Sequence, residues 1–361
     1  MKTKKLIPLY LLILVIALIL YTLFAIKPLG KEYQFSPVWK ISTSNPSIKK
    51  VDDNTKKLYF SLDKSVGYFT ENGDVTLYEK YPVKASISNN YYSIYDNKAS
   101  NTPFYDNNGN LLGNIQASGF PYFKDDLIFV FLPGGSSFAK CNEKGEIMWS
   151  FAGTLPITAF SAKEKYTAVG FANGYIKIFN TETGALQLTY APGGSDYPVI
   201  LGLDISDDGQ YIASISGHNE QRFVLSRREG NQQKIIYHNF IDSELPYQTL
   251  VHFCEDNNRV LYNYEGHLGI FDIGKGSNTI IPMKNKIIEI EESENLTYLL
   301  GKGIKDESKG GREYTVYIVE NTNALEGEFS FFAHNAFIKT DGNDLYVGKD
   351  HFISKLSVTK E

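Results

Sequence analysis

The sequence predicts an all-β fold built from repeated four-stranded units. Aromatic residues make up 14% of the 361 residues, with 25 Tyr and 23 Phe, and the chain has 30 Gly. This composition favours strands and turns over helices. A polar, Gly-containing turn also recurs between short strands of alternating polarity about every forty residues. Almost no segment after residue 30 has a helical period, which argues against α/β alternatives.

The recurrent turn sets the repeat. It is marked by Gly73, Gly109, Gly145, Gly184, Gly230, Gly276 and Gly327, at spacings of 36, 36, 39, 46, 46 and 51 residues. Two further strand-like runs precede each hairpin. One unit, for example, reads as strands over 199–205, 211–216, 222–226 and 234–238. Four antiparallel strands in about forty residues, repeated along the chain, are typical of β-propeller blades.

The two ends of the repeat region predict an eighth blade. Seven Gly-marked hairpins leave three strands at the end of the chain, over 336–339, 345–348 and 352–358, without a fourth partner. The early strand 38–42 is also unpaired. Joining it to the last three completes a blade and removes two open sheet edges. The prediction is a propeller over 38–358 with eight blades of about 41 residues; seven blades are the alternative, if 84–115 merges with a neighbour.

Three segments carry a family resemblance. The chain resembles WD-repeat propellers in the turn and apolar strand DISDDGQYIASIS (204–216). It resembles WD and pyrroloquinoline-quinone-type hairpins in GYIKIFNTETGALQL (174–188) and NEKGEIMWSF (142–151), although the Trp-Asp and Gly-His signatures of strong WD repeats are absent. The resemblance implies ring closure between the terminal strands. In architecture the chain is also similar to the propeller lipoprotein of outer-membrane β-barrel assembly, without that family's lipid-bearing cysteine.

The N-terminal segment differs from the rest of the chain. Residues 6–26 form an uninterrupted apolar run preceded by three lysines and not followed by a small-residue cleavage site. As a helix this run is about 31 Å long, which matches the hydrocarbon core of a bilayer. We therefore expect a signal anchor rather than a cleaved signal peptide. The expected organisation is a cytoplasmic head (1–5), a transmembrane helix (6–26), a linker (27–37) and a periplasmic or extracellular propeller.

The charge of the chain indicates which class of partner it can bind, and its two cysteines indicate whether it contains a disulfide. The chain has a formal net charge of −5, and the part after residue 30 has 32 basic against 41 acidic residues. An acidic domain is a poor nucleic-acid binder, so we expect no nucleic-acid partner. Cys141 and Cys254 fall in different repeat units and are expected to be free, half-buried thiols.

The sequence contains no recognisable catalytic motif. It lacks Gly-x-Ser-x-Gly, His-Glu-x-x-His, a Walker loop and Cys-x-x-Cys, and its six histidines are scattered. Asp106, Asn108 and Asn110 alternate oxygen donors, but Gly109 is misplaced for a calcium loop, so we interpret them as a hairpin turn. No catalytic residue, metal site or cofactor is predicted. We expect a non-catalytic scaffold that binds another protein, in cell-envelope assembly; the alternative is an enzyme or small-ligand sensor with its site in the central channel.

Loop length indicates where a partner would bind. The longest loops, 191–198, 238–247 and 301–314, together with 216–221, are expected on one face of the propeller. Tyrosine gives a large contact area at low entropic cost, and the acids at 196, 242 and 244 would favour a basic partner. The predicted contacts are Tyr197, His218, Asp242, Glu244 and Tyr247. The alternative is that these loops have lengthened without functional consequence.

Overall fold

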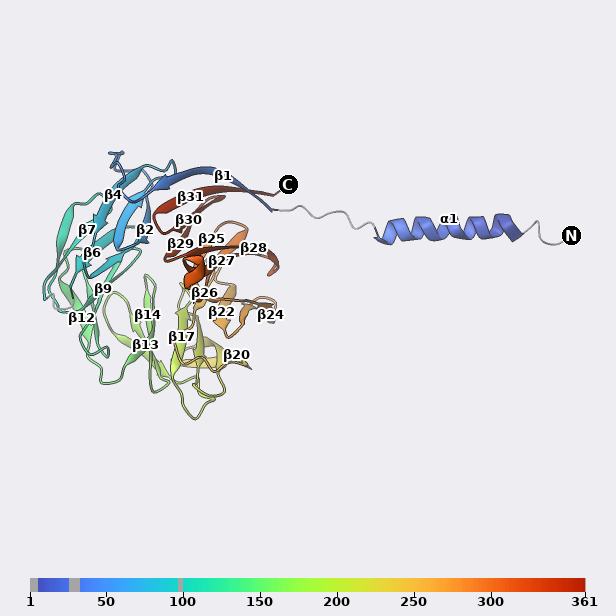
Figure 1. Ribbon diagram of the computed structural model, residues 1–361. Helices are drawn as coiled ribbons and strands as arrows, with labels where there is room; N and C mark the ends of the chain where they lie inside the picture. Colours follow the sequence, from blue (N-terminus) through green and yellow to red (C-terminus); the bar gives the residue numbers. More distant parts are fainter. Residues whose placement is uncertain (1–5, 26–32, 97–99, 361) are drawn as a thin grey trace. The chain divides into compact units, whose positions relative to one another are not determined.

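The computed structural model describes residues 6–25, 33–96 and 100–360 (Figure 1). Residues Phe35–Val358 make up the larger of two compact units. Its strands form eight antiparallel sheets that follow one another around a common centre. The larger unit is therefore a β-propeller, and we number its blades in chain order.

Blades 1 to 4 are formed by consecutive strands. Blade 1 consists of β2 (Leu58–Leu62), β3 (Ser65–Phe69) and β4 (Val75–Lys80), and blade 2 of β5 (Lys84–Ile87), β6 (Tyr91–Tyr95), β7 (Thr102–Asp106) and β8 (Leu111–Ile115). Blade 3 consists of β9 (Phe120–Lys124), β10 (Leu127–Phe131), β11 (Phe138–Cys141) and β12 (Ile147–Phe151), and blade 4 of β13 (Ile157–Ala162), β14 (Tyr166–Phe171), β15 (Ile176–Asn180) and β16 (Leu186–Tyr190).

Blades 5 to 7 repeat this order, and blade 8 joins the two ends of the propeller. Blade 5 consists of β17 (Ile200–Ile205), β18 (Tyr211–Ser216), β19 (Arg222–Glu229) and β20 (Gln232–Phe240), and blade 6 of β21 (Val251–Phe253), β22 (Arg259–Tyr264), β23 (His267–Asp272) and β24 (Ser277–Pro282). Blade 7 consists of β25 (Lys286–Glu292), β26 (Leu296–Asp306), β27 (Gly311–Glu320) and β28 (Leu325–Ala333), and blade 8 of β29 (Ala336–Asp341), β30 (Asp344–Lys349), β31 (Phe352–Lys360) and β1 (Tyr33–Ser42).

The predicted ring closure is confirmed. The early strand β1 pairs with β31 in the order β1-β31-β30-β29, which completes the eighth blade. The seven-blade alternative is wrong, because β5 to β8 form a sheet of their own. Closure places an early strand and the last strands in the same sheet, so that neither end of the repeat leaves an open blade.

Blade 1 is the exception to the four-stranded pattern. Among the described residues it has three strands, β2, β3 and β4. The β3–β4 hairpin carries a Gly turn and a register shift between Tyr68 and Phe69, like the outer hairpins of blades 3 and 4. These are therefore the three outer strands of the blade, and β2 takes the inner edge.

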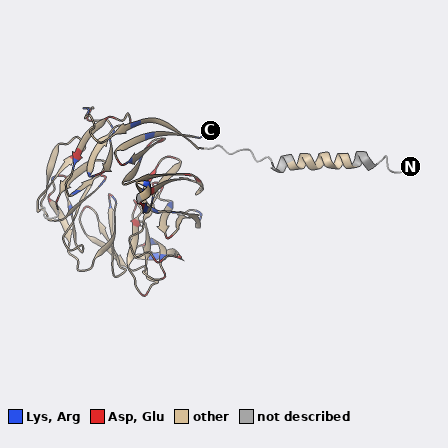
Figure 2. Cartoon of the chain, in the orientation of Figure 1, with Lys and Arg blue, Asp and Glu red and all other residues tan. Residues whose placement is uncertain are grey.

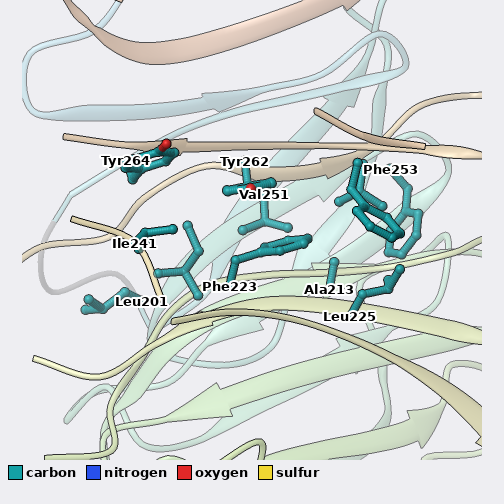
Figure 3. Packing of buried hydrophobic residues seen from close by; sticks show 12 residues of the cluster. Leu201, Ala213, Phe223, Leu225, Ile241, Val251, Phe253, Tyr262 and Tyr264 are labelled. Atoms are coloured by element: carbon teal, nitrogen blue, oxygen red, sulfur yellow. The ribbon is translucent and has the colours of Figure 1, made fainter. Parts of the chain in front are cut away.

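The hydrophobic core lies between neighbouring blades. Phe223 of β19 and Tyr262 of β22 stack face to face, with ring centroids 3.8 Å apart and planes 7° apart (Figure 3). Leu201, Phe253 and their neighbours complete this fully buried cluster between blades 5 and 6. Burial of each large apolar side chain contributes about 1.5–3 kcal/mol. The high aromatic content of the sequence is therefore used to fill the spaces between sheets.

Two sequence-based boundaries in blade 7 are wrong. Gly327 lies inside β28 rather than in the turn, where Asn323 takes the positive φ of +67° instead. Asparagine tolerates this left-handed conformation better than most residues. The predicted loop 301–314 is largely strand, because β26 and β27 continue into it and meet at a short 3₁₀ turn, η2 (Glu307–Lys309).

The N-terminal prediction requires a correction. Residues 6–25 form helix α1 (Leu6–Ala25). In the described part of the chain, no helix is long and apolar enough to cross a membrane. The single-pass localisation predicted from residues 6–26 is therefore wrong, and the transmembrane helix is not confirmed. The predicted head (1–5), residue 26 of the predicted transmembrane helix and residues 27–32 of the predicted linker (27–37) lie outside the described residues.

Candidate interaction face and channel mouth

Two loops of the predicted face are joined directly. The carbonyl of Tyr197, in the loop between blades 4 and 5, accepts a hydrogen bond from the His218 backbone N–H at 3.1 Å. Ser195 Oγ donates to the carbonyl of Asn219 at 2.8 Å. These bonds connect a blade-to-blade loop to the turn between β18 and β19. The two loops therefore form one continuous surface.

Gln221 connects the third loop to the other two. Its side-chain Nε2 donates to the Leu245 carbonyl at 2.6 Å, and its own carbonyl accepts from the Ile241 N–H at 2.9 Å. Gln221 is fully buried. Nothing in the sequence indicated this role, since a lone Gln in a polar loop has no distinguishing pattern. The loops 191–198, 217–221 and 241–250 are called the loop face below.

All five predicted contact residues lie exposed on the loop face. Tyr197 is 62% and Tyr247 42% exposed, and His218, Asp242 and Glu244 are also in contact with solvent. The Lys286 ammonium lies 3.8 Å from the centroid of the Tyr247 ring. Tyr247 thus lies where the loop face borders a basic side chain. Across the blades, charged residues of both signs are mixed (Figure 2).

The protein beneath the loop face has unpaired polar atoms. Within the described residues, several buried side-chain atoms in or next to these loops have no hydrogen-bond partner: those of Ser214, Ser216, Gln221 (Oε1), Ser243 and Thr249. A buried polar atom without a partner destabilises the fold by about 1–3 kcal/mol.

The opposite end of the central channel opens into a charged cavity of about 910 Å³. Because the strands are antiparallel, the turns between first and second strands all meet at this end. The turns of blades 3 to 8 contribute its wall, with Lys163, Asp207, Glu255, Glu292 and Asp341 among the lining residues. Acids, lysines and His252 therefore converge here, a juxtaposition that scattered sequence positions did not reveal.

Polar side chains connect the inner strands of four blades beside this cavity. Asp204 of β17 accepts a hydrogen bond from Ser161 Oγ of β13 at 2.5 Å, and one from the Phe253 backbone N–H of β21 at 2.7 Å. The next link is between His252 Nε2 and Glu292 Oε1, 2.7 Å apart. Blades 4, 5, 6 and 7 are thus held in register by hydrogen bonds along the channel wall.

A buried cation, Lys339, extends these polar contacts between inner strands to blade 8. Lys339 of β29 lies 2.8 Å from Glu289 Oε1 and 2.5 Å from Glu291 Oε1, and its ammonium is 4.5 Å from the centroid of the Tyr59 ring. Burial opposes its charge, but the nearby Glu289, Tyr59 and Glu291 outweigh burial and raise the pKa of Lys339. Burial raises the pKa of Glu291, and the nearby charge of Lys339 offsets this rise only in part. Lys339 is therefore charged and is shared between two carboxylates.

The remaining candidate groups offer little chemistry. Cys141 and Cys254 are free, as predicted, and both are fully rather than half buried. Burial raises the pKa of Cys141 to about 11, and that of Cys254 further still, so neither is a thiolate nucleophile at neutral pH. Asp106 accepts backbone hydrogen bonds from Asn108 and Asn110, both at 2.8 Å, as the hairpin interpretation requires. Over the described residues, no cluster of three His, Cys, Asp or Glu side chains is arranged to hold a metal ion.

A family model described as beta-propeller protein matches residues 1–361. The chain belongs to this family. An uncharacterized protein of Treponema pallidum (strain Nichols) is 28% identical to this beta-propeller protein over 280 residues, which cover 75% of this chain and 74% of the relative. The resemblance to propellers expected from the sequence is therefore confirmed.

Solved structures share the fold of this beta-propeller protein. BamB from Moraxella catarrhalis matches with a TM-score of 0.60 and 13% identity, covering 90% of this chain and all of that one. A chain of a mitotic checkpoint complex matches with a TM-score of 0.54 and 12% identity, covering 92% of this chain and 99% of that one. At these identities the likeness concerns the architecture.

Proposed function

We propose that this beta-propeller protein is a non-catalytic scaffold that binds another protein through the loop face. The observation that best supports the proposal is the joining of three loops into one surface through Gln221 and the Tyr197 carbonyl. A surface held in this way loses little conformational entropy on binding. Two of its loops carry exposed tyrosines, Tyr197 and Tyr247, and tyrosine is enriched in protein interfaces.

The first prediction tests the loop face by crosslinking in intact cells. The double variant Tyr197→Ala with Asp242→Lys removes one exposed ring and reverses one exposed charge on this face. We expect it to abolish capture of the partner that the native chain captures, with the unfolding temperature unchanged, since both residues are exposed.

A matched control makes this test specific. Leu186→Ala with Glu182→Lys changes one exposed apolar residue and one exposed acid on and beside the outer strand of blade 4. This control should capture as much partner as the native chain. Unaltered capture by the Tyr197→Ala, Asp242→Lys variant would show that the loop face is not the binding face. The identity of the captured partner also tests the expected role in cell-envelope assembly, which stays a prediction.

The channel mouth supports a second candidate function, the binding of a small charged ligand. A cavity of about 910 Å³ lined by acids, lysines and a histidine falls in the range of small-molecule sites. Thermal unfolding in the presence of a panel of small charged metabolites tests it. A ligand of this site should raise the unfolding temperature of the native chain but not that of Lys163→Gln, whose ammonium is 2.9 Å from Asp207 in the cavity wall.

A further inference from the structure

A second large hollow, of about 1210 Å³, lies at the border of blades 6 and 7. It is lined by the long β26–β27 hairpin, the loop after β24, the β22–β23 turn and the middle of the 241–250 loop, on the same side of the propeller as the loop face. Its charged lining is predominantly basic: six lysines and arginines (Lys284, Lys286, Lys302, Lys305, Lys309, Arg312) against three acids (Glu265, Asp306, Glu313). In a chain whose net charge is −5, this is a local reversal of sign.

Two of these lysines lie side by side on neighbouring strands of blade 7. Lys286 of β25 and Lys302 of β26 are register partners in the antiparallel pair. Like charges in directly opposed positions destabilise a sheet. Burial lowers the pKa of Lys286, and the charge of Lys302 lowers it further. The strand pair therefore carries a repulsion that any neutral residue at position 302 would remove.

Three of these cations, Lys286, Lys302 and Arg312, are not paired with a carboxylate among the described residues. Lys286 donates to the Gln248 carbonyl at 2.8 Å, and Arg312 Nη1 lies 3.5 Å from the Gly303 carbonyl. Both partners are neutral. Across the described residues, Lys286, Lys302 and Arg312 form no salt bridge with any carboxylate, whereas Lys284 is paired with Glu328 at 2.7 Å. Three cations on one wall are thus available to an anionic partner.

Apolar surface accompanies these cations. Phe332 and Ile304 also line the hollow; Phe332 is partly exposed and Ile304 is 89% exposed. The volume exceeds the range of about 300–1,000 Å³ usual for small-molecule pockets. Charge, apolar surface and size together suit an extended chain segment that carries carboxylates between apolar side chains. They suit a compact inorganic anion less well.

We propose that this basic groove binds an acidic segment of the partner protein. Carboxylates of the segment would be bound by Lys286, Lys302 and Arg312, and its apolar side chains would contact Phe332 and Ile304. The inference rests on the proposed scaffold function and specifies the partner's chemistry. Tyr247, which borders the loop face and lies under Lys286, joins the two surfaces. The basic partner expected from the acidic loop rim would thus also need an acidic segment at this groove.

Fluorescence anisotropy on the full chain tests the groove. The probe is a rhodamine-labelled peptide of alternating glutamate and leucine, compared with the same peptide carrying glutamine for glutamate. We expect the acidic peptide to bind at least about tenfold more tightly, with an affinity that falls as salt rises. Lys302→Gln should weaken its binding about five- to tenfold, Lys302→Arg should retain it, and the control Lys50→Gln, an exposed lysine outside the groove, should leave it unchanged.

Stability provides an independent readout. Since Lys302→Gln removes a like-charge repulsion, its unfolding temperature should equal or exceed that of the native chain, and the pKa of Lys286, followed by NMR, should rise. Weaker peptide binding in this variant would then not be a folding defect. Equal affinity for both peptides, or for Lys302→Gln and the native chain, would overturn the proposal. Tighter binding of phosphatidylglycerol vesicles than of the peptide, lost in Lys302→Gln, would also overturn it and assign the groove to a lipid surface.

The two proposals fail separately. If capture in cells depends on Tyr197 and Asp242 but the acidic peptide does not bind, the loop face is supported and the proposed role of the groove is contradicted. Peptide binding that depends on Lys302, combined with capture that is insensitive to Tyr197 and Asp242, would do the reverse.

Discussion

Lys339 lies in the channel wall with only 6% of its side chain exposed, between two carboxylates that are 24% and 20% exposed. Each of these charges has lost most of its hydration, and the attraction among them offsets that loss only while all three are present. Glu289 also accepts the Ile338 backbone N–H at 3.0 Å, so the same group fixes blade 8 against blade 7.

The second prediction follows from this arrangement. Lys339→Met should lower the free energy of unfolding by about 3–5 kcal/mol, because it leaves Glu289 and Glu291 buried without a counter-charge. Denaturant unfolding measures the change. The control is Lys56→Met, which breaks a 2.6 Å pair with Asp341 in which Lys56 is 68% exposed, and should cost less than about 1 kcal/mol. Equal losses in the two variants would contradict the buried role of Lys339.

At the scale of elements, a Trp on the outer strand of one blade contacts the Gly turn of the next. Trp149 of β12 donates from Nε1 to the Thr181 carbonyl at 3.0 Å, and its ring covers Gly184 in the β15–β16 turn. A Cβ on Gly184 would lie 2.6 Å from the Trp149 ring, and the φ of +73° already disfavours other residues. Here glycine is required for both space and conformation.

The third prediction separates these two requirements. Gly184→Ala should destabilise the propeller by about 2–3 kcal/mol, through the positive φ and the clash with Trp149 together. Gly230→Ala has a similar φ of +64° but nothing within 4 Å of the added Cβ, and should cost about 1 kcal/mol. Thermal unfolding of the two variants measures the difference. If both lose the same amount, the Trp contact adds nothing to the turn.

For the propeller unit, closure between blade 8 and blade 1 repeats this contact. Trp39 of β1 donates from Nε1 to the Glu71 carbonyl at 3.0 Å and lies against Gly73. Its ring also meets Phe69 and Tyr346, with centroids 6.3 and 5.9 Å away. The same Trp–turn contact thus occurs between two consecutive blades, at Trp149, and between the last blade and the first, at Trp39.

The fourth prediction compares these two positions. Trp39→Ala should lower the free energy of unfolding by about 2–3 kcal/mol, less than the loss of a fully buried Trp would. It should also increase hydrogen exchange along β1 and β31, because it loosens the strand that closes the ring. Trp149→Ala should destabilise by a similar amount but leave exchange in β1 and β31 unchanged. Increased exchange of β1 in both variants would show that closure is no weaker than the other blade contacts.

The sequence by itself determined the repeat and its local chemistry. Strand alternation and Gly turns such as that at Gly184 depend on neighbouring residues, so the eight blades and their strand order could be predicted. The exposed loops at Tyr197 and Asp242 could be named for the same reason, since loop length is visible in the chain. Where another residue can take the turn conformation, as Asn323 does, the Gly marker misplaced the turn by a few residues.

Contacts between blades were decided only by the tertiary structure. Lys339 meets Glu289 across 50 residues, and Asp204 reaches the Phe253 N–H across 49. Such pairs depend on how far each inner strand is shifted along the channel, a quantity that no local pattern encodes. The opposition of Lys286 and Lys302 likewise needed the β25–β26 register, because a one-residue shift would have placed the two charges on opposite faces of the sheet.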